Sequence, residues 1–332
     1  FLAGPTLDML QKEKVGLVDF LSLNRYSTFL HFYSAESAKK PKGSNDETSI
    51  QVFARGYMKL TNSDYIKLTK FIKPSYVASL SELPDYQEGG KKSHQRAMTK
   101  SVAFLSEMQR ELIDHPTKVL ATIFPSKVEG LLEKCIKQLV SSNPAGYSVI
   151  GLEMLSEADR NNQLVQIMKH LGDEGKAKPV VISTSGEPFE VLQAMSLGVS
   201  FFETSYPFKL AEKANASLLS SLDFDEKTYT KKEDFSFDSL NGKKAKFTSM
   251  IDTQHKTVFE PISEKCECYT CQNHTRGYIQ HLLECDEMTA YVLITIHNVV
   301  TYNRFIENSK KALASGNFAA FASYVLENLA EP

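Results

Sequence analysis

The middle of the chain alternates short apolar runs with segments of helical periodicity. Four apolar, β-rich runs predict buried strands, and they lie at 118–124, 146–152, 179–185 and 199–205. Between them, apolar residues recur at spacings of three and four, as one buried face of a helix requires. An earlier unit combines a strand over 76–82 with a helix from about 94 to 112.

The helices between the strands have recognisable apolar faces. The first face consists of Val128, Leu131, Leu132, Cys135, Ile136, Leu139 and Val140. Cys135 is therefore predicted to be a core residue. A second face contains Leu164, Val165, Ile167, Met168 and Leu171. A third helix is predicted to begin near Pro188 and to end at Gly198, in keeping with the usual places of proline and glycine at helix ends.

Five successive strand–helix units with nearly continuous apolar strands predict a parallel sheet covered by helices. None of the units contains the G-x-G-x-x-G turn of a dinucleotide-binding fold. The α/β pattern therefore favours a (β/α)8 TIM barrel. The pattern defines the strands before residue 60 poorly.

The alternation stops near Leu222, which predicts three segments. Residues 1–222 form the barrel, which begins at Phe1 with neither an initiator Met nor a signal peptide. This start indicates that the chain begins partway through a gene product and that the barrel is truncated. Residues 223–263 form a polar insertion and connecting segment, solvated or flexible where Lys, Asp, Glu and Ser dominate. Residues 264–332 contain a cysteine cluster and two or three helices.

Composition excludes several classes of protein. With 42% hydrophobic and 23% charged residues in 332, the chain is not disordered, collagen-like or a disulfide scaffold. The net charge of −2 means that a nucleic-acid site must be a local patch. No apolar run approaches the roughly 18 residues of a membrane span. Three of the five cysteines fall within six residues, which indicates a metal site in a reducing compartment, and hence the cytoplasm.

The spacing Cys266-x-Cys268-x2-Cys271 is typical of a metal site. A closed site with four ligands would hold structural zinc, because no coordination position remains for a substrate. The alternative is three cysteines without a metal. The fourth ligand is open among four residues: His274, His281, Cys285 and His297.

His297 is predicted to point inward from a helix that starts near Glu287. It shares a face with Leu293, Ile294 and Val300. Spacing alone does not distinguish a metal ligand from a core histidine at this position. Cys285, at a helix end, is predicted to be a plain apolar or partly exposed thiol.

The cysteine segment resembles the zinc site of the tRNA-guanine transglycosylase family. The resemblance includes Cys266-x-Cys268-x2-Cys271-x25-His297 with Asn298 and Tyr302, and also Glu260-Pro261-Ile262 and Asn273-His274-Thr275-Arg276. It extends from about Ser27 to Leu329 and is densest between Gly198 and Leu313. It implies a (β/α)8 barrel with an embedded zinc subdomain, and one structural Zn2+ held by Cys266, Cys268, Cys271 and His297.

Catalytic members of this family replace a guanine at the tRNA wobble position through a covalent Asp–ribose intermediate. In the matching segment, 198–209, Glu203 takes the place of the nucleophilic Asp. Its side chain is longer by one methylene, about 1.5 Å, and attack is sensitive to errors of that size. Lys209 replaces an Arg and loses the fork geometry of the guanidinium.

The base-binding positions have also changed. Asp46 aligns with the acid/base Asp, but the two glycines that follow it in the family are absent. Ser81 replaces a base-binding Asp and cannot accept the paired N–H donors of a guanine edge. Phe124 occupies a Gln position, and Ile150 adds bulk in place of a glycine. The resemblance therefore implies that the chain has no catalytic residues of its own.

The resemblance is strongest to the non-catalytic members of the family. It implies a heterodimer with a catalytic queuine tRNA-ribosyltransferase subunit, acting on tRNA with G-U-N anticodons, and it leaves self-association open. It also implies a peripheral place on the mitochondrial outer membrane. Two alternatives are an active transglycosylase, with Glu203 as nucleophile and Asp46 as base, and a barrel scaffold that no longer acts on tRNA.

Phosphate contacts, if present, are expected in the basic segment 91–96 with Lys100. A solvated loop and helix start explains this segment equally well. The same holds for Lys231-Lys232 and Lys243-Lys244 in the polar segment.

Overall fold

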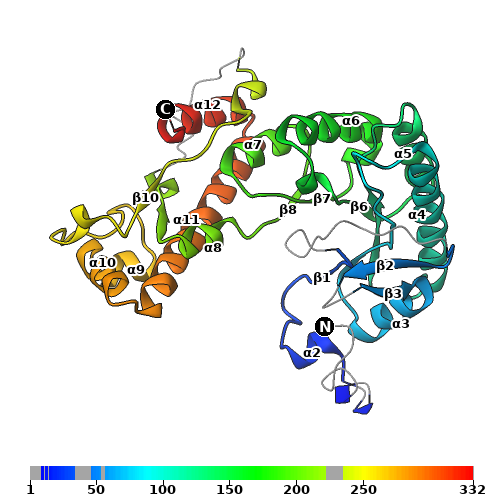
Figure 1. Cartoon of the computed structure of the whole chain (residues 1–332), viewed down its shortest axis with the longest axis horizontal. Coiled ribbons are helices and arrows are strands. Elements are labelled where there is room, and N and C mark those ends of the chain that lie inside the picture. The colour runs from blue at the N-terminus through cyan, green and yellow to red at the C-terminus, as the bar shows by residue number, and fades with distance from the viewer. Residues whose placement is uncertain are drawn as a thin grey trace. The chain divides into compact units, whose positions relative to one another are not determined.

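The computed structural model describes residues 9–10, 12–13, 15–33, 46–53, 57–221 and 235–331. The chain divides into two compact units. Unit 1 consists of Phe1–Ser183 and Leu197–Phe202, and unit 2 consists of Thr184–Ser196 and Glu203–Pro332. Figure 1 labels the elements of both units.

Unit 1 is built on a sheet with the strand order β1-β4-β5-β6-β7-β8. The strands are β1 (Phe29–Leu30), β4 (Tyr76–Ala78), β5 (Lys118–Ile123), β6 (Gly146–Val149), β7 (Val180–Ser183) and β8 (Phe201–Glu203). The printed pairings from β1 through β7 are all parallel. The mixed α/β class with a parallel sheet is thus confirmed, and the described strands form a six-stranded sheet.

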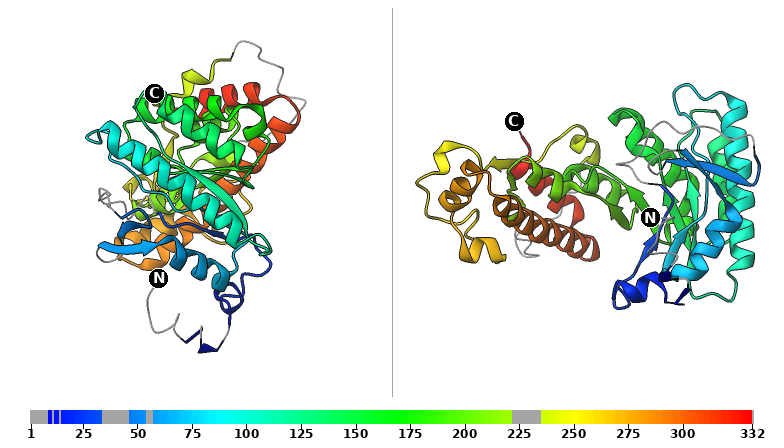
Figure 2. Two further views of the ribbon diagram at one scale, coloured as in Figure 1. Left: turned by 90° about the vertical axis from the view of Figure 1, so that its right-hand side faces the viewer. Right: turned by 60° about the horizontal axis from the view of Figure 1, so that its bottom comes forward.

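Helices cover this sheet as the periodicity predicts. They are α3 (Asn62–Ile72), α4 (Lys91–Glu111), α5 (Leu131–Ser141) and α6 (Glu157–Lys176), with a short α2 (Leu17–Phe20) before them. Figures 1 and 2 show α4, α5 and α6 on the same face of the sheet. Cys135 lies in the core of α5, as predicted. The hairpin of β2 (Ser49–Phe53) and β3 (Tyr57–Thr61) is antiparallel, and the apolar pattern did not predict it.

The strands are shorter than their apolar runs. β4 ends at Ala78, where side chains begin to replace backbone groups in the pairing with β5. The Ser79 amide still donates to the Leu120 carbonyl at 2.9 Å, but the Thr122 amide donates to Ser79 Oγ at 3.1 Å. β6 ends at Val149 because Gly151 has a φ of +82° and starts the 3-10 turn η1 (Leu152–Met154). Apolar residues therefore continue beyond the strands into buried turns.

Gly151 meets two requirements that a side chain would violate. Its φ is positive, and a methyl group there would lie 2.8 Å from Leu83 Cδ1. Gly130, at the start of α5, also has a positive φ, +67°, but open space surrounds it. Both glycines require left-handed backbone, but only Gly151 also has a close neighbour. Comparing substitutions at the two positions therefore distinguishes the cost of backbone strain from the cost of steric contact.

We expect Gly130→Ala to lower the free energy of unfolding by about 1–2 kcal/mol, the cost of left-handed backbone for an L-residue. Gly151→Ala should cost more, because Leu83 must also move. Urea unfolding followed by circular dichroism measures both variants. Equal losses of unfolding free energy in the two variants would mean that Leu83 moves aside at no cost.

Unit 2 is organised around the long helix α11 (Met288–Ala314). Its other helices are α7 (Pro188–Ser196), α8 (Tyr206–Glu212), α9 (Tyr269–Asn273), α10 (Arg276–Glu284) and α12 (Phe318–Leu329). α8, α9, α10 and α12 all contact α11. Figure 1 shows α9 and α10 near the beginning of α11 and α12 near its end. The predicted C-terminal helices are confirmed.

A small ribbon joins the parts of unit 2. β9 (Asn215–Ser217) pairs antiparallel with β10 (Phe247–Ser249), and β9 also contacts α11. The remaining short turns are η2 (Leu219–Ser221), η3 (Phe237–Leu240) and η4 (Thr253–His255). α8 and β9 lie before residue 222, within the segment predicted to form the barrel, and both pack on α11. The division into three segments, with limits at 222 and 263, stays a prediction.

The polar segment is structured where the structure describes it. Residues 222–234, with Lys231 and Lys232, lie outside the described residues. From 235 onward the chain forms η3 and β10 and is anchored by aromatic residues, while residues 241–244 are exposed. Phe237 stacks on Phe318 of α12, with ring centroids 5.5 Å apart, and Leu240 is buried.

Glu187 anchors the C-terminal end of unit 2 through a buried carboxylate. It is 8% exposed and accepts a hydrogen bond from the Ala245 amide. Ala245 in turn bridges Ala330. Burial raises the pKa of Glu187 to about 7, and the nearby carboxylates of Glu190 and Glu331 raise it further. The hydrogen bond from Ala245 and the charge of Lys244 oppose this rise.

Because the folded state holds the Glu187 proton more tightly than the unfolded chain does, stability falls as pH rises from about 4.5 to 7 and then levels off. Glu187→Gln keeps an acceptor for Ala245 and removes this loss. We expect the variant to exceed the wild type in unfolding free energy at pH 8, by at most about 3 kcal/mol, and to match it near pH 4.5. Urea unfolding at both pH values tests this, with exposed Glu212→Gln as control. A constant difference between the two pH values would refute the assignment.

Candidate metal centre

Four residues from two parts of unit 2 meet beside the first half of α11. Cys266 and Cys268 precede α9, Cys271 lies on α9, and His297 lies on α11. Cys268 caps α9, and its sulfur accepts the Cys271 amide at 3.4 Å. This turn brings the second and third sulfurs of the predicted motif onto one side.

The ligand atoms of the four residues all lie within 4.8 Å of one another. His297 Nδ1 is 3.3 Å from Cys271 Sγ and 3.7 Å from Cys268 Sγ. Zn–S and Zn–N bonds of about 2.3 and 2.0 Å at a tetrahedral angle place sulfur and nitrogen about 3.5 Å apart. The cluster therefore has the dimensions to hold a metal ion.

The chemistry of the donors fits a cation as well. Cys266, Cys268 and His297 are buried and Cys271 is half-buried. Hydrogen bonds with Cys266 and Cys271 lower the pKa of the Cys268 thiol, while those with Cys266 and Cys268 raise the pKa of Cys271. Once one sulfur ionises, its neighbour resists ionisation. A bound cation removes that repulsion, because metals bind thiolates and displace their protons.

His297 is oriented from its other side. Its Nε2 lies 3.0 Å from the carbonyl oxygen of Ser217 on β9. If Nε2–H donates to this carbonyl, Nδ1 carries the free lone pair and faces the sulfurs. A backbone carbonyl in this place is a usual partner of a metal-binding imidazole.

The other candidates for a fourth ligand lie outside the cluster. His274 stacks with Tyr278 at 5.3 Å and contacts Tyr269 at 5.6 Å. Cys285 is exposed, as predicted, and its sulfur is 3.9 Å from His281. The helix of His297 begins at Met288 with Glu287 as its cap, in agreement with the prediction. Val300 does not share its buried face, since it is 41% exposed.

The family of the chain follows from its sequence as a whole. The model of the family described as queuine tRNA-ribosyltransferase matches residues 2–331. The chain belongs to the queuine tRNA-ribosyltransferase family.

Curated relatives are similar over most of their length. A Xenopus tropicalis protein named queuine tRNA-ribosyltransferase accessory subunit 2 is 26% identical, over 86% of this chain and 74% of the relative. A Danio rerio protein of the same name is 24% identical, over 96% and 82%. A Pseudoalteromonas atlantica protein named queuine tRNA-ribosyltransferase is 25% identical, over 69% of this chain and 54% of the relative.

The three positions that the sequence resemblance predicts to replace base-contacting residues lie in the core of unit 1. Phe124 and Ile150 are buried. Ser81 is also buried, and its hydroxyl lies 2.6 Å from the hydroxyl of Ser101 on α4.

The two carboxylates have different surroundings. Asp46 accepts hydrogen bonds from the Thr48 amide and hydroxyl at 2.8 and 2.7 Å and forms an ion pair with Lys59. The Lys59 contact, followed by those with Thr48, lowers the pKa of Asp46 well below its usual range. Such a group stays ionised at neutral pH and is a weak acceptor of protons. Glu203 ends β8 and is half-buried, as is Ser205 after it.

The basic segment on α4 is mostly internal. Lys91 and Lys92 are exposed, but Lys100 is buried with its Nζ 2.5 Å from Glu82 Oε2. Arg96 binds the other oxygen of Glu82 at 2.8 Å. His94 is also buried. Lys100 and Arg96 are thus engaged with Glu82, and a phosphate-binding role for the segment 91–96 with Lys100 stays a prediction. Lys243 and Lys244 are exposed.

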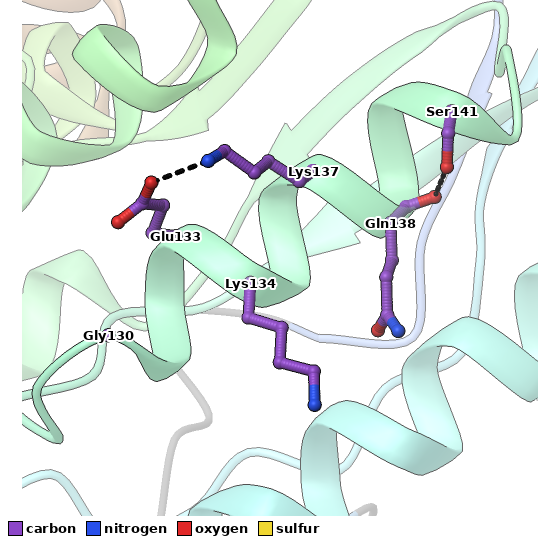
Figure 3. Close-up of a pocket in the computed structure, with 6 residues that line it drawn as sticks. All are labelled: Gly130, Glu133, Lys134, Lys137, Gln138 and Ser141. Atoms are coloured by element: carbon purple, nitrogen blue, oxygen red, sulfur yellow. Dashed lines mark hydrogen bonds and ion pairs between the residues drawn. The ribbon is translucent and has the colours of Figure 1, made fainter.

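Two hollows open on unit 1. The larger, of about 790 Å³, lies between residues 47–48, the start of α3 and the Arg96–Lys100 side of α4. The smaller, of about 460 Å³, is an open depression along α5 whose lining residues include Glu133 and Lys137, an ion pair at 2.7 Å. Figure 3 shows that its lining side chains all come from this one helix and the glycine before it. Neither hollow includes a residue of the metal cluster.

Within the described ranges, no helix has both the length and the apolar character that crossing a membrane requires. Sequence reasoning missed the Ser217 carbonyl and the Glu82 ion pairs. A backbone acceptor leaves no trace in residue type, and Glu82 and Lys100 are 18 positions apart.

We expect Cys268→Ser and His297→Ala to lose bound metal and to unfold the region around α9, because metal-binding free energy contributes directly to folding. Metal content by atomic emission and circular dichroism measure the two effects. Cys285→Ser is the matched control and should retain both metal and fold. Full metal content in His297→Ala would exclude His297 as a ligand.

Proposed function

We propose that the chain is a non-catalytic accessory subunit that pairs with a catalytic queuine tRNA-ribosyltransferase. The pair exchanges guanine for queuine at the wobble position of tRNAs with G-U-N anticodons. The observation that carries this proposal is the occupation of the matched base-contacting positions by Ser81, Phe124 and Ile150, all buried. The names of the Xenopus and Danio relatives support the same role.

Base binding would require these positions to open. A guanine edge needs paired acceptors and an adjacent flat surface, whereas Ser81 is bonded to Ser101 and Ile150 fills space beside Gly151. Each missing hydrogen bond in a buried pocket costs about 1–3 kcal/mol. Several such losses together remove useful affinity for the base.

The acid/base position supports the same conclusion. A general base works best with a pKa near the operating pH, whereas the Lys59 ion pair lowers the pKa of Asp46. Glu203 keeps the charge of a nucleophile at the end of β8 but has a longer side chain. An active transglycosylase would have to use both groups in these altered states.

The retained parts are the scaffold and the metal site. The proposal includes closure of the parallel sheet into a (β/α)8 barrel, and a structural Zn2+ at Cys266, Cys268, Cys271 and His297. When bound, this ion supplies cross-linking and no reactive position, because all four ligands come from the protein.

The pairing surface is proposed to lie next to the metal site. Tyr278 stacks on His274, Tyr269 meets the same ring edge-on, and the two tyrosines are 45% and 57% exposed. Exposed aromatic residues are typical of protein interfaces. The family resemblance is the support for tRNA as the substrate of the pair, and for a cytoplasmic place with peripheral association with the mitochondrial outer membrane.

Incorporation of radiolabelled guanine into a cognate tRNA tests the proposal. We expect no incorporation with this chain alone, and with an equimolar mixture more incorporation than with the catalytic subunit alone. Activity of the chain alone, abolished by Glu203→Gln, would identify an active transglycosylase. No effect on the catalytic subunit would favour a scaffold unrelated to tRNA.

The same assay shows whether the Glu203 carboxylate takes part in the reaction of the pair. Glu203→Gln in this chain should leave the activity of the mixture within about twofold of the wild-type mixture, because the proposal gives Glu203 no part in the reaction. A loss of activity by orders of magnitude would show that Glu203 is a nucleophile.

A further inference from the structure

Asn298 follows His297 on α11 and is fully buried. Its amide makes three hydrogen bonds to backbone groups that lie more than 80 positions away. Oδ1 accepts the Ser217 amide at 2.8 Å, and Nδ2 donates to the carbonyls of Asn215 at 2.9 Å and Pro207 at 3.2 Å. One side chain thus holds both β9 and the beginning of α8.

Both backbone polar groups of Ser217 are held by α11. Its N–H donates to Asn298, and its carbonyl lies 3.0 Å from His297 Nε2. The two residues that hold it are adjacent on α11, so the strand and the helix form a closed loop of hydrogen bonds. A shift of Ser217 would remove the partner of the imidazole.

We propose that Asn298 is a positioning residue of the metal site. It fixes the Ser217 carbonyl where that oxygen accepts Nε2–H of His297, and this bond keeps the Nδ1 lone pair directed at Cys268 and Cys271. The hydrogen-bond partners of the Asn298 amide are backbone groups of Ser217, Asn215 and Pro207, so its role is assigned through the Ser217 backbone and not as a ligand.

The contacts of Asn298 exceed what packing alone requires. An apolar side chain of the same size would fill the space but would leave the Ser217 amide and two carbonyls without this partner. Thr301, one turn later, is also buried, yet its hydroxyl bonds the carbonyls of His297 and Asn298 within α11. Asn298, by contrast, joins the helix to other elements.

The hydrogen bonds of Asn298 also affect the segment between Glu203 and Ser217. α8 and β9 are joined to α11 through Pro207, Asn215 and Ser217. Metal bound at His297 therefore stabilises this segment as well as α9. The inference rests on the metal site and is independent of the accessory role.

Zinc affinity, measured by competition with a chromophoric chelator, tests the assignment. Asn298→Ala should weaken zinc binding by about 10–100-fold, the usual effect of removing a partner of a metal-bound imidazole. Asn298→Asp keeps an acceptor for the Ser217 amide and should lose less. Cobalt-substituted protein should show an altered visible spectrum in Asn298→Ala.

Tyr302→Phe is the matched control on the same helix. It removes a buried hydrogen bond, from the hydroxyl to the Gly186 carbonyl at 2.8 Å, but leaves His297 and Ser217 in place. It should lower thermal stability without changing zinc affinity or the cobalt spectrum. Equal zinc affinity in Asn298→Ala and the wild type would overturn the proposal.

Hydrogen exchange of the wild type covers the case in which Asn298→Ala does not fold. Removing zinc with a chelator should speed exchange of the Ser217 amide, while amides of β5 in unit 1 stay unchanged. Unaltered exchange at Ser217 would overturn the coupling. A wild type that binds no zinc would refute the metal site itself, a result distinct from either.

Discussion

The contact between the His297 imidazole and the Ser217 carbonyl is the constraint on which unit 2 depends. It joins a strand to the long helix α11 and, on the opposite edge of the ring, it directs Nδ1 to the sulfurs of α9. α8, α9, α10 and α12 also pack on α11, the helix that carries this ring. With three of its four residues buried, the candidate metal site is part of the core of this unit rather than an addition to its surface.

The sequence was informative where residue type alone determines the outcome. Thiols at metal-binding spacing identified three of the four clustered groups, and apolar periodicity located α4 to α7 and the strands between them. It was less informative where backbone geometry decides. The ends of β4 and β6 depend on Ser79 and on the positive φ of Gly151, and the apolar runs continue past both. Likewise, an inward position for His297 was predictable, but the Ser217 carbonyl that orients it was not.

The contrast between the two candidate sites has one physical basis. A structural metal site needs only that its ligands stay close, and the fold around α11 provides this. A base-exchange pocket needs open space and unsatisfied hydrogen-bonding groups at the strand ends. In unit 1 those ends are closed by Phe124 and Ile150, and the Ser81 hydroxyl is bonded to Ser101. The proposed loss of the pocket and the proposed metal site are compatible because they depend on different residues.

The buried ion pairs of Glu82 have a consequence for how RNA contacts on this chain are mapped. Lys100 and Arg96 belong to a stretch that looks basic and accessible, yet Lys100 is buried, Arg96 is half-buried, and both are paired with the buried Glu82. Removing either cation leaves a buried carboxylate without its full set of partners, which is strongly unfavourable. A scan that replaces every basic residue of α4 and scores only tRNA retention would therefore count misfolded variants as binding-deficient ones. Lys91 and Lys92, which are exposed, are the positions of this segment at which such a scan reports on binding.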